Sequence, residues 1–167
     1  MIRTLDTILR LILVAIFSVL VVCVVWQVLS RYALGTPSTV TDELARFLFM
    51  WLALIGGAYT LGQRRHLAID FVLQTLTGRP KAVLEGVILG LIAVFALLIM
   101  VKGGLGLTLK TLASGQVTPA LQIPMAWVYA AIPFAGIVML IYCAAFLIDL
   151  ARHGATVSDG PTAGPLD

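Results

Sequence analysis

The chain has 167 residues, of which 60% are hydrophobic and 11% are charged, and its formal net charge is +3. Soluble domains carry about 25% charged residues, and a soluble domain this small has too much surface to hide so many apolar side chains. Composition therefore excludes a soluble monomer, a disordered chain and a coiled coil. It predicts an all-α integral membrane protein. Because the basic residues stand in ones and twos between apolar runs, they indicate membrane orientation, and we expect no nucleic-acid partner.

Four transmembrane helices are predicted, over about 11–30, 44–63, 86–105 and 125–148. The first uncharged run has 20 residues, about 30 Å of helix and hence the thickness of a hydrocarbon core. It is longer than a signal-peptide core, so we expect an uncleaved helix. The last uncharged run, 111–148, is divided at Pro119 and Pro124, because proline lacks the amide donor of a helix. Near the end of the third span, Lys102 is expected to snorkel toward the interface.

The connection between the second and third spans is predicted to hold a short amphipathic helix over about 66–77. Apolar residues recur there at Ile69, Val72, Leu73 and Leu76, a helical spacing typical of a segment that lies on membrane lipid. An ordinary loop is the alternative. Residues 1–151 then form the four-helix transmembrane domain. Glycine, proline and small polar residues predict a disordered cytoplasmic tail over 152–167.

Orientation follows from the basic residues, which are enriched on the cytoplasmic side of membrane proteins. One side holds seven of them and the other holds four. The seven are Arg3, Arg10, Arg64, Arg65, Arg79, Lys81 and Arg152, and the four are Arg31, Arg46, Lys102 and Lys110. Both termini are therefore expected to be cytoplasmic, as an even number of spans requires.

Little in the sequence points to chemistry within the membrane. Intramembrane function commonly needs ionisable residues at mid-depth, and none is predicted at the centre of a span. The two histidines, His66 and His153, lie outside the predicted spans, which disfavours a haem-binding anchor of a redox complex. A stand-alone small exporter would need an embedded carboxylate. Catalytic and metal motifs are missing from the sequence, so we expect no enzymatic activity and no catalytic, substrate-binding or metal residues.

Polar side chains gather at the start of the second span. Thr41 is a candidate N-cap, Asp42 and Arg46 are spaced i, i+4 and can pair, and Arg31 could join Glu43 across a short turn. Three interpretations stay open at this point. The cluster fixes depth and tilt, docks a partner subunit, or holds a substrate or ion.

A second polar pair and two small-residue pairs complete the candidates. His66 and Asp70 are spaced i, i+4 and would share a helix face, where they bond each other or contact a partner or lipid headgroup. Gly86 with Gly90, and Ala131 with Ala135, have the small-xxx-small spacing that lets membrane helices approach closely.

Two segments, 41–71 and 113–136, resemble the small membrane subunit of tripartite ATP-independent periplasmic (TRAP) transporters, the DctQ-like family. The first segment carries a glutamate followed by alanine-arginine, then tryptophan and glycine, then a histidine-to-aspartate step. The second carries threonine-proline-alanine, isoleucine-proline, tyrosine and proline. These motifs fall on Glu43, Ala45, Arg46, Trp51, Gly57, His66 and Asp70, and on Thr118, Pro119, Ala120, Ile123, Pro124, Tyr129 and Pro133.

The resemblance implies a role as a brace in the bacterial inner membrane. In this family a large multi-span permease subunit carries the substrate and sodium sites and works by an elevator motion. A periplasmic binding protein delivers the solute, usually a carboxylate. The small subunit is then expected to hold no cofactor, with sodium on the large subunit only. The candidate partner-docking residues are Arg31, Asp42, Glu43, Arg46, Trp51, Gly57, His66, Asp70, Pro124, Tyr129 and Pro133.

Overall fold

The computed structural model describes residues 2–63 and 79–153. The predicted interfacial helix of residues 66–77 and the tail from residue 154 lie outside this part of the chain. Within it, four helices are long and apolar enough to cross a membrane: Arg3–Ala33, Thr39–Gly62, Val83–Ala113 and Met125–Arg152. The predicted all-α fold with four transmembrane helices is therefore confirmed.

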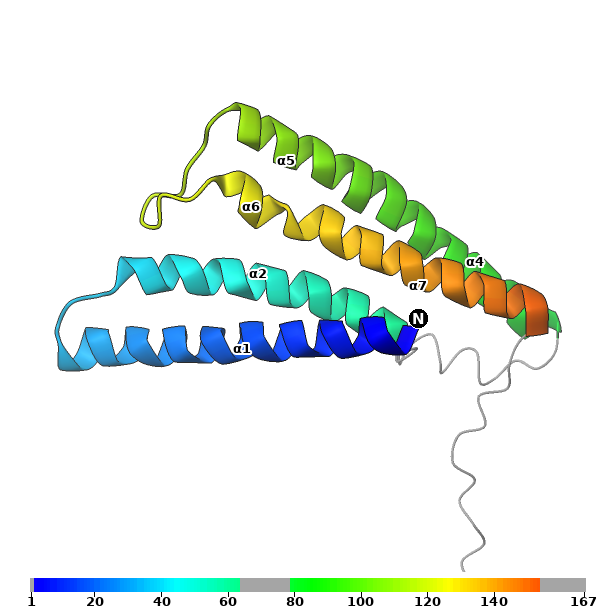
Figure 1. Cartoon of the computed structure of the whole chain (residues 1–167), viewed down its shortest axis with the longest axis horizontal. Helices are drawn as coiled ribbons and strands as arrows, with labels where there is room; N and C mark the ends of the chain where they lie inside the picture. Colours follow the sequence, from blue (N-terminus) through cyan, green and yellow to red (C-terminus); the bar gives the residue numbers. More distant parts are fainter. Residues whose placement is uncertain (1, 64–78, 154–167) are drawn as a thin grey trace, which may run out of the picture.

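The first two helices form an antiparallel hairpin, with α1 (Ile2–Ala33) and α2 (Thr39–Gly62) side by side (Figure 1). The turn between them closes because the Ser30 hydroxyl donates to the Thr36 carbonyl and the Thr36 N–H donates to the Ser30 carbonyl. Gly35 has a φ of 68° in this turn, a left-handed conformation that glycine adopts without steric cost. The Gln27 side-chain amide then donates to the Thr41 carbonyl at 2.8 Å and fastens the two helices together.

The second hairpin begins with one long rod made of α4 (Arg79–Phe95), the π-helix η1 (Ala96–Gly103) and α5 (Gly104–Ala113). The chain returns through a loop of residues 114–124, α6 (Met125–Tyr129) and α7 (Ala131–His153) (Figure 1). The helix is interrupted at Ala130 because Pro133 has no N–H for the Tyr129 carbonyl.

Two predicted boundaries differ from the structure. The third spanning helix continues to Ala113 rather than ending near residue 105. Nothing in the sequence from 103 to 113 breaks a helix in lipid, where glycine is tolerated. Arg152 and His153, which were expected to begin the tail, belong to the last turn of α7.

The core of the bundle surrounds α7, which packs against α2, α4 and η1. In an 18-residue apolar stretch of the segment Met125–Arg152, 44% of residues are buried, against 11% in the corresponding stretch of Arg3–Ala33. Gly136 on α7 and Gly104 on α5 make two of the close contacts between helices. A methyl group added at Gly136 would lie 2.7 Å from the Met100 Cβ, and one at Gly104 would lie 2.9 Å from the Pro133 Cδ. These contacts fix the rod and α7 as one packed pair.

The small-residue pairs singled out in the sequence occupy different surroundings. Ala131 and Ala135 are completely buried along α7. Gly86 lies against Leu150, with 3.6 Å from an added methyl group to the Leu150 Cδ2, whereas Gly90 has nothing within 4 Å. The tightest helix approaches thus involve glycines outside the GxxxG spacing.

Candidate functional site

A carboxylate joins the two hairpins at the end of the bundle that holds the turns. Glu43, in the first turns of α2, accepts the backbone N–H of Ala120 at 2.9 Å and that of Leu121 at 2.8 Å, both on the same Oε2 atom. Figure 1 shows the loop after α5 reaching toward the start of α2. Two N–H groups in a row form a small anion-binding concavity, so Glu43 fastens the loop of the second hairpin to the first.

The loop that receives Glu43 is itself held by a closed set of hydrogen bonds. Thr118 is completely buried, donates its N–H to the Ile123 carbonyl at 2.9 Å, and accepts the Ile123 N–H on its hydroxyl at 3.2 Å. The Gln122 N–H donates to the Thr118 carbonyl, with Gln122 at a φ of 55°. These bonds aim the Ala120 and Leu121 amides outward to the carboxylate.

The neighbouring polar residues follow the sequence predictions in part. Asp42 and Arg46 form the predicted i, i+4 ion pair at 2.6 Å, with side chains 50% and 75% exposed. An exposed helical pair of this kind contributes only about 0.3–0.5 kcal/mol. The exposed pair is therefore better suited to contact with another molecule than to holding the fold.

Two expectations about this cluster are wrong. Arg31 makes no ion pair with Glu43, because the Glu43 carboxylate faces the loop; the Arg31 guanidinium lies 6.0 Å from the Tyr32 ring centre instead. Thr41 is not the N-cap. The helix begins at Thr39 after Ser38, and the Thr41 hydroxyl donates to the Ser38 carbonyl at 3.2 Å.

A second polar contact joins the hairpins at the opposite end. The Tyr142 hydroxyl of α7 donates to the Asp6 carboxylate of α1, and the tyrosine is completely buried. Gly62 of α2 lies directly on the Tyr142 ring, where any added side-chain carbon would collide with it. Asp6, Gly62 and Tyr142 thus bring three helices together. Sequence reasoning missed this contact because Asp6 and Tyr142 are 136 residues apart.

Between these two ends the hairpins meet through apolar contacts. The Trp51 ring of α2 lies 6.1 Å from the Phe134 ring of α7. A methyl group added at Gly57 would lie 3.9 Å from the Met139 Cε. Trp51 and Gly57, predicted as docking residues, therefore face α7 of their own chain.

The remaining predicted site residues are spread over several elements. Pro124 is the N-cap of α6, Tyr129 ends α6, and buried Pro133 packs against Gly104. His66 and Asp70 lie outside the described residues. The structure thus gathers Asp42, Glu43 and Arg46 at one helix start.

Buried polar side chains in the described ranges are satisfied locally. They are Ser30, Thr111 and Thr118, and their hydroxyls bond backbone groups at most six residues away. Over residues 2–63 and 79–153, no three histidine, cysteine or acidic side chains are placed to hold a metal ion. These three hydroxyls therefore stabilise the turn, helix or loop in which each of them lies.

The family model described as tripartite ATP-independent periplasmic transporters, DctQ component, matches residues 20–153. The chain belongs to this family. It is a member of the small permease subunits of TRAP transporters. The predicted resemblance is confirmed.

Three curated relatives carry related descriptions. The sialic acid TRAP transporter small permease protein SiaQ of Vibrio cholerae is 30% identical over 79 residues, 47% of this chain and 46% of the relative. The C4-dicarboxylate TRAP transporter small permease protein DctQ of Rhodobacter capsulatus is 29% identical over 113 residues, 68% of this chain and 49% of the relative. The sialic acid TRAP transporter permease protein SiaT of Haemophilus influenzae is 25% identical over 127 residues, 76% of this chain but only 20% of the relative. The chain thus spans about half the length of the small permeases it matches.

Proposed function

We propose that this chain braces the large permease subunit of a TRAP transporter in the bacterial inner membrane. The transporter imports a carboxylate-bearing solute, which a periplasmic binding protein delivers and a sodium gradient drives. In this proposal the large subunit carries the solute and sodium sites and undergoes the elevator motion. The small subunit stays still and performs no reaction.

The observation that carries the proposal is the fastening of the two hairpins at both ends. Glu43 holds the loop of the second hairpin at one end, and Asp6 with Tyr142 holds α7 to α1 at the other. Between them Trp51 and Phe134 make an apolar contact. Hydrogen bonds to charged groups contribute about 1.5–3 kcal/mol each, so shearing the hairpins past each other is unfavourable. A part that resists shear at both ends is suited to support a moving neighbour.

The longer relative supports a large permease as the partner. The chain matches only a fifth of the length of the permease SiaT, so a segment like this one occurs within a longer permease polypeptide. A shared polypeptide keeps its segments at high effective concentration. For separate chains, the corresponding surfaces have to supply the association themselves.

The proposed class of solute is supported by the solutes that appear in the names of the relatives. Sialic acid and C4-dicarboxylates are different molecules that share a carboxylate. A carboxylate-bearing solute is therefore the class we propose, without assigning one compound.

The proposed orientation places both termini in the cytoplasm. The start of α1, the start of α4 and the end of α7 lie at the end of the bundle that holds the N-terminus, and the turn from α1 to α2 lies at the other end (Figure 1). The first group of segments carries Arg3, Arg10, Arg79 and Arg152, whereas Arg31 and Arg46 flank the turn. Reporter fusions test this directly. A C-terminal green fluorescent protein should fluoresce, and a C-terminal alkaline phosphatase should be inactive; the reverse result contradicts the orientation.

Co-purification followed by reconstitution tests the role itself. The tagged chain is extracted from native membranes, and companions are identified by mass spectrometry. We expect a multi-span permease among them. Proteoliposomes then receive this chain alone, the permease alone or both, together with the binding protein and a sodium gradient. Uptake should require both subunits, whereas uptake by this chain alone would overturn the brace.

A further inference from the structure

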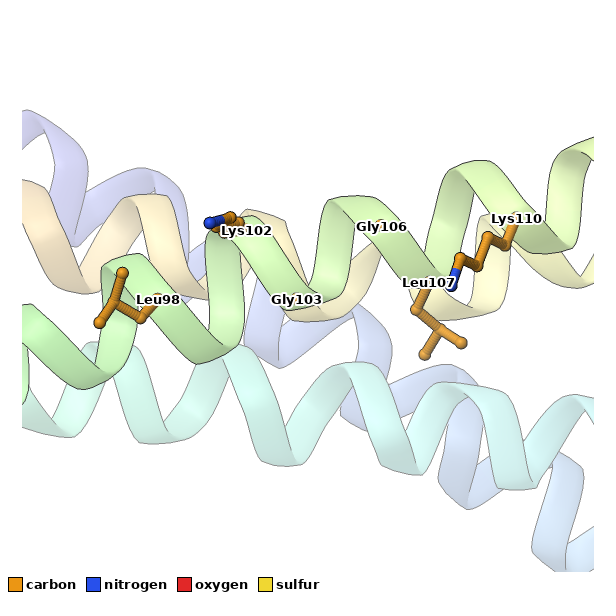
Figure 2. Close-up of a pocket in the computed structure, with 6 residues that line it drawn as sticks. All are labelled: Leu98, Lys102, Gly103, Gly106, Leu107 and Lys110. Atoms are coloured by element: carbon orange, nitrogen blue, oxygen red, sulfur yellow. The ribbon is translucent and has the colours of Figure 1, made fainter.

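An open groove runs along the outer face of the third spanning helix, in η1 and α5. Its volume is about 680 Å³, and its lining residues all belong to this one helix: Leu98, Lys102, Gly103, Gly106, Leu107 and Lys110 (Figure 2). Leu98, Lys102, Gly106 and Lys110 follow one another at every fourth position. The groove is therefore a lengthwise hollow in the helix surface, with a lysine at its middle and another at one end.

Lys102 lies near the middle of the bundle in the direction across the membrane. Its neighbour Val101 lies against Gly136, and Gly104 lies against Pro133, so Lys102 is level with residues 134–135 of α7. That level is within about one helical turn, or about 6 Å, of the centre of the spanning segment Met125–Arg152. The third spanning segment runs over Val83–Ala113, so Lys102 lies well inside it rather than near its end.

The surroundings of Lys102 leave its ammonium without an acceptor. Its side chain is exposed, and no ion pair or hydrogen bond joins it to residues 2–63 or 79–153. The end of α5 at Ala113 is about 16 Å away along the helix. The four-carbon stem does not span that distance. A charged side chain at this depth faces partners in membrane proteins rather than lipid tails.

The glycines of the groove are not used by the chain's own packing. Nothing lies within 4 Å of an added methyl group at Gly106, and Gly103 meets only the Leu98 carbonyl of its own helix, at 3.7 Å. Gly104, between them, contacts α7 instead. Small residues on an open face let another helix approach closely. The π-helix η1 ends here. Such segments are rare in proteins, and those that occur are often found at functional sites.

We propose that this groove receives a transmembrane helix of the large permease subunit, which brings a carboxylate to Lys102. This inference rests on the proposed function and names the surface that carries it. Charge complementarity selects the occupant. A lipid phosphate lies at the interface, about 15 Å from the bilayer centre. A second copy of this chain in the same groove would set lysine against lysine.

The direction of Lys110 fits the same occupant. Its side chain runs back toward Leu107 and the middle of the groove, away from the nearby helix end (Figure 2). Both amines thus border one surface. A partner helix lying in the hollow contacts them from the same side.

Co-purification of the two subunits tests the surface. The variants are Lys102→Glu, Lys102→Met and Gly106→Leu in the tagged full chain. The control is Ala15→Leu, an exposed position on α1, which packs against α2 in the other hairpin. We expect Lys102→Glu and Gly106→Leu to recover at least tenfold less large subunit. Lys102→Met should reduce recovery less, and the control should match the wild type.

A photo-crosslinking residue at Leu107 keeps the test independent of whether those variants fold. It should cross-link to the large subunit, and the same residue at exposed Val22 of α1 should not. Charge exchange identifies the contact: an aspartate or glutamate of the large subunit changed to lysine should restore recovery with Lys102→Glu.

Three results overturn parts of the account separately. Normal recovery of both groove variants, without a cross-link at Leu107, would refute the groove and leave the brace standing. Restoration of Lys102→Glu by added phosphatidylglycerol, with no charge exchange found, would identify lipid as the occupant and refute the partner helix. Failure of the wild-type chain to recover any permease would refute the proposed function itself.

Discussion

Removing the Glu43 carboxylate is expected to release the loop of residues 114–124 from the start of α2. Glu43→Ala takes away the acceptor of two backbone N–H groups, at 2.9 and 2.8 Å. A hydrogen bond to a charged group contributes about 1.5–3 kcal/mol, and Glu43 is half-buried, so we estimate about 2–4 kcal/mol for the pair. Glu43→Gln keeps a neutral acceptor of about half the strength and should lose about 1–2 kcal/mol.

Hydrogen–deuterium exchange of the purified protein measures this loss where it occurs. Because 1.4 kcal/mol corresponds to a tenfold change, peptides covering Ala120 and Leu121 should exchange about 30-fold to several hundred-fold faster in Glu43→Ala. Asp42→Ala is the matched control. It removes the adjacent carboxylate, whose pair with Arg46 is exposed and contributes about 0.3–0.5 kcal/mol. If these loop peptides exchange at the same rate in Glu43→Ala and Asp42→Ala, Glu43 does not hold the loop.

Four further substitutions test the other contacts one at a time. Tyr142→Phe removes the hydrogen bond to Asp6 and should lower the thermal unfolding midpoint, with a loss of about 1.5–3 kcal/mol; an unchanged midpoint would count against this contact. Gly136→Val places a side chain within 2.7 Å of the Met100 Cβ and should destabilise by about 1–3 kcal/mol. Gly90→Ala meets nothing within 4 Å and should be neutral or stabilising by up to about 1 kcal/mol; equal effects of the two glycine changes would contradict the packing described. Arg46→Ala should leave stability within about 0.5 kcal/mol yet reduce co-purification of the partner or the loaded binding protein, and unchanged recovery and uptake would remove Arg46 from the docking surface.

Local patterns in the sequence predicted local structure well. Uncharged runs located all four spans, Pro119 and Pro124 marked the loop of residues 114–124, and the i, i+4 spacing predicted the pair of Asp42 and Arg46. Each of these signals acts within one or two helical turns. Its physical cause is hydrophobic length, a missing amide donor or the geometry of one helix.

Contacts between segments that are distant in the sequence could not be predicted from local sequence patterns. Glu43 bonds residues 77 and 78 positions away, and a carboxylate gives no sign in the sequence of which backbone amides it will meet. Arg31 was the nearest available cation, and proximity in sequence made it a wrong partner. The contact of Asp6 with Tyr142 was missed for the same reason.

Helix length was the other source of error. The prediction ended the third span near residue 105, where a span of ordinary length would finish, and so placed Lys102 near the interface. The helix continues to Ala113, so Lys102 lies well inside it rather than near its end. Gly104 and Gly136 likewise escaped notice because their tight contacts pair different helices rather than repeat along one.

The distance between the hairpins during transport tests the brace most directly. Spin labels are placed at exposed Leu11 on α1 and exposed Leu91 on α4, with the two buried native cysteines, Cys23 and Cys143, replaced by alanine. Double electron–electron resonance is then recorded on the complex with the large subunit, with and without sodium and the loaded binding protein. The account predicts one narrow distance distribution that stays the same in every state. A shift of several ångströms upon loading would show that the hairpins move with the cargo and would contradict the account.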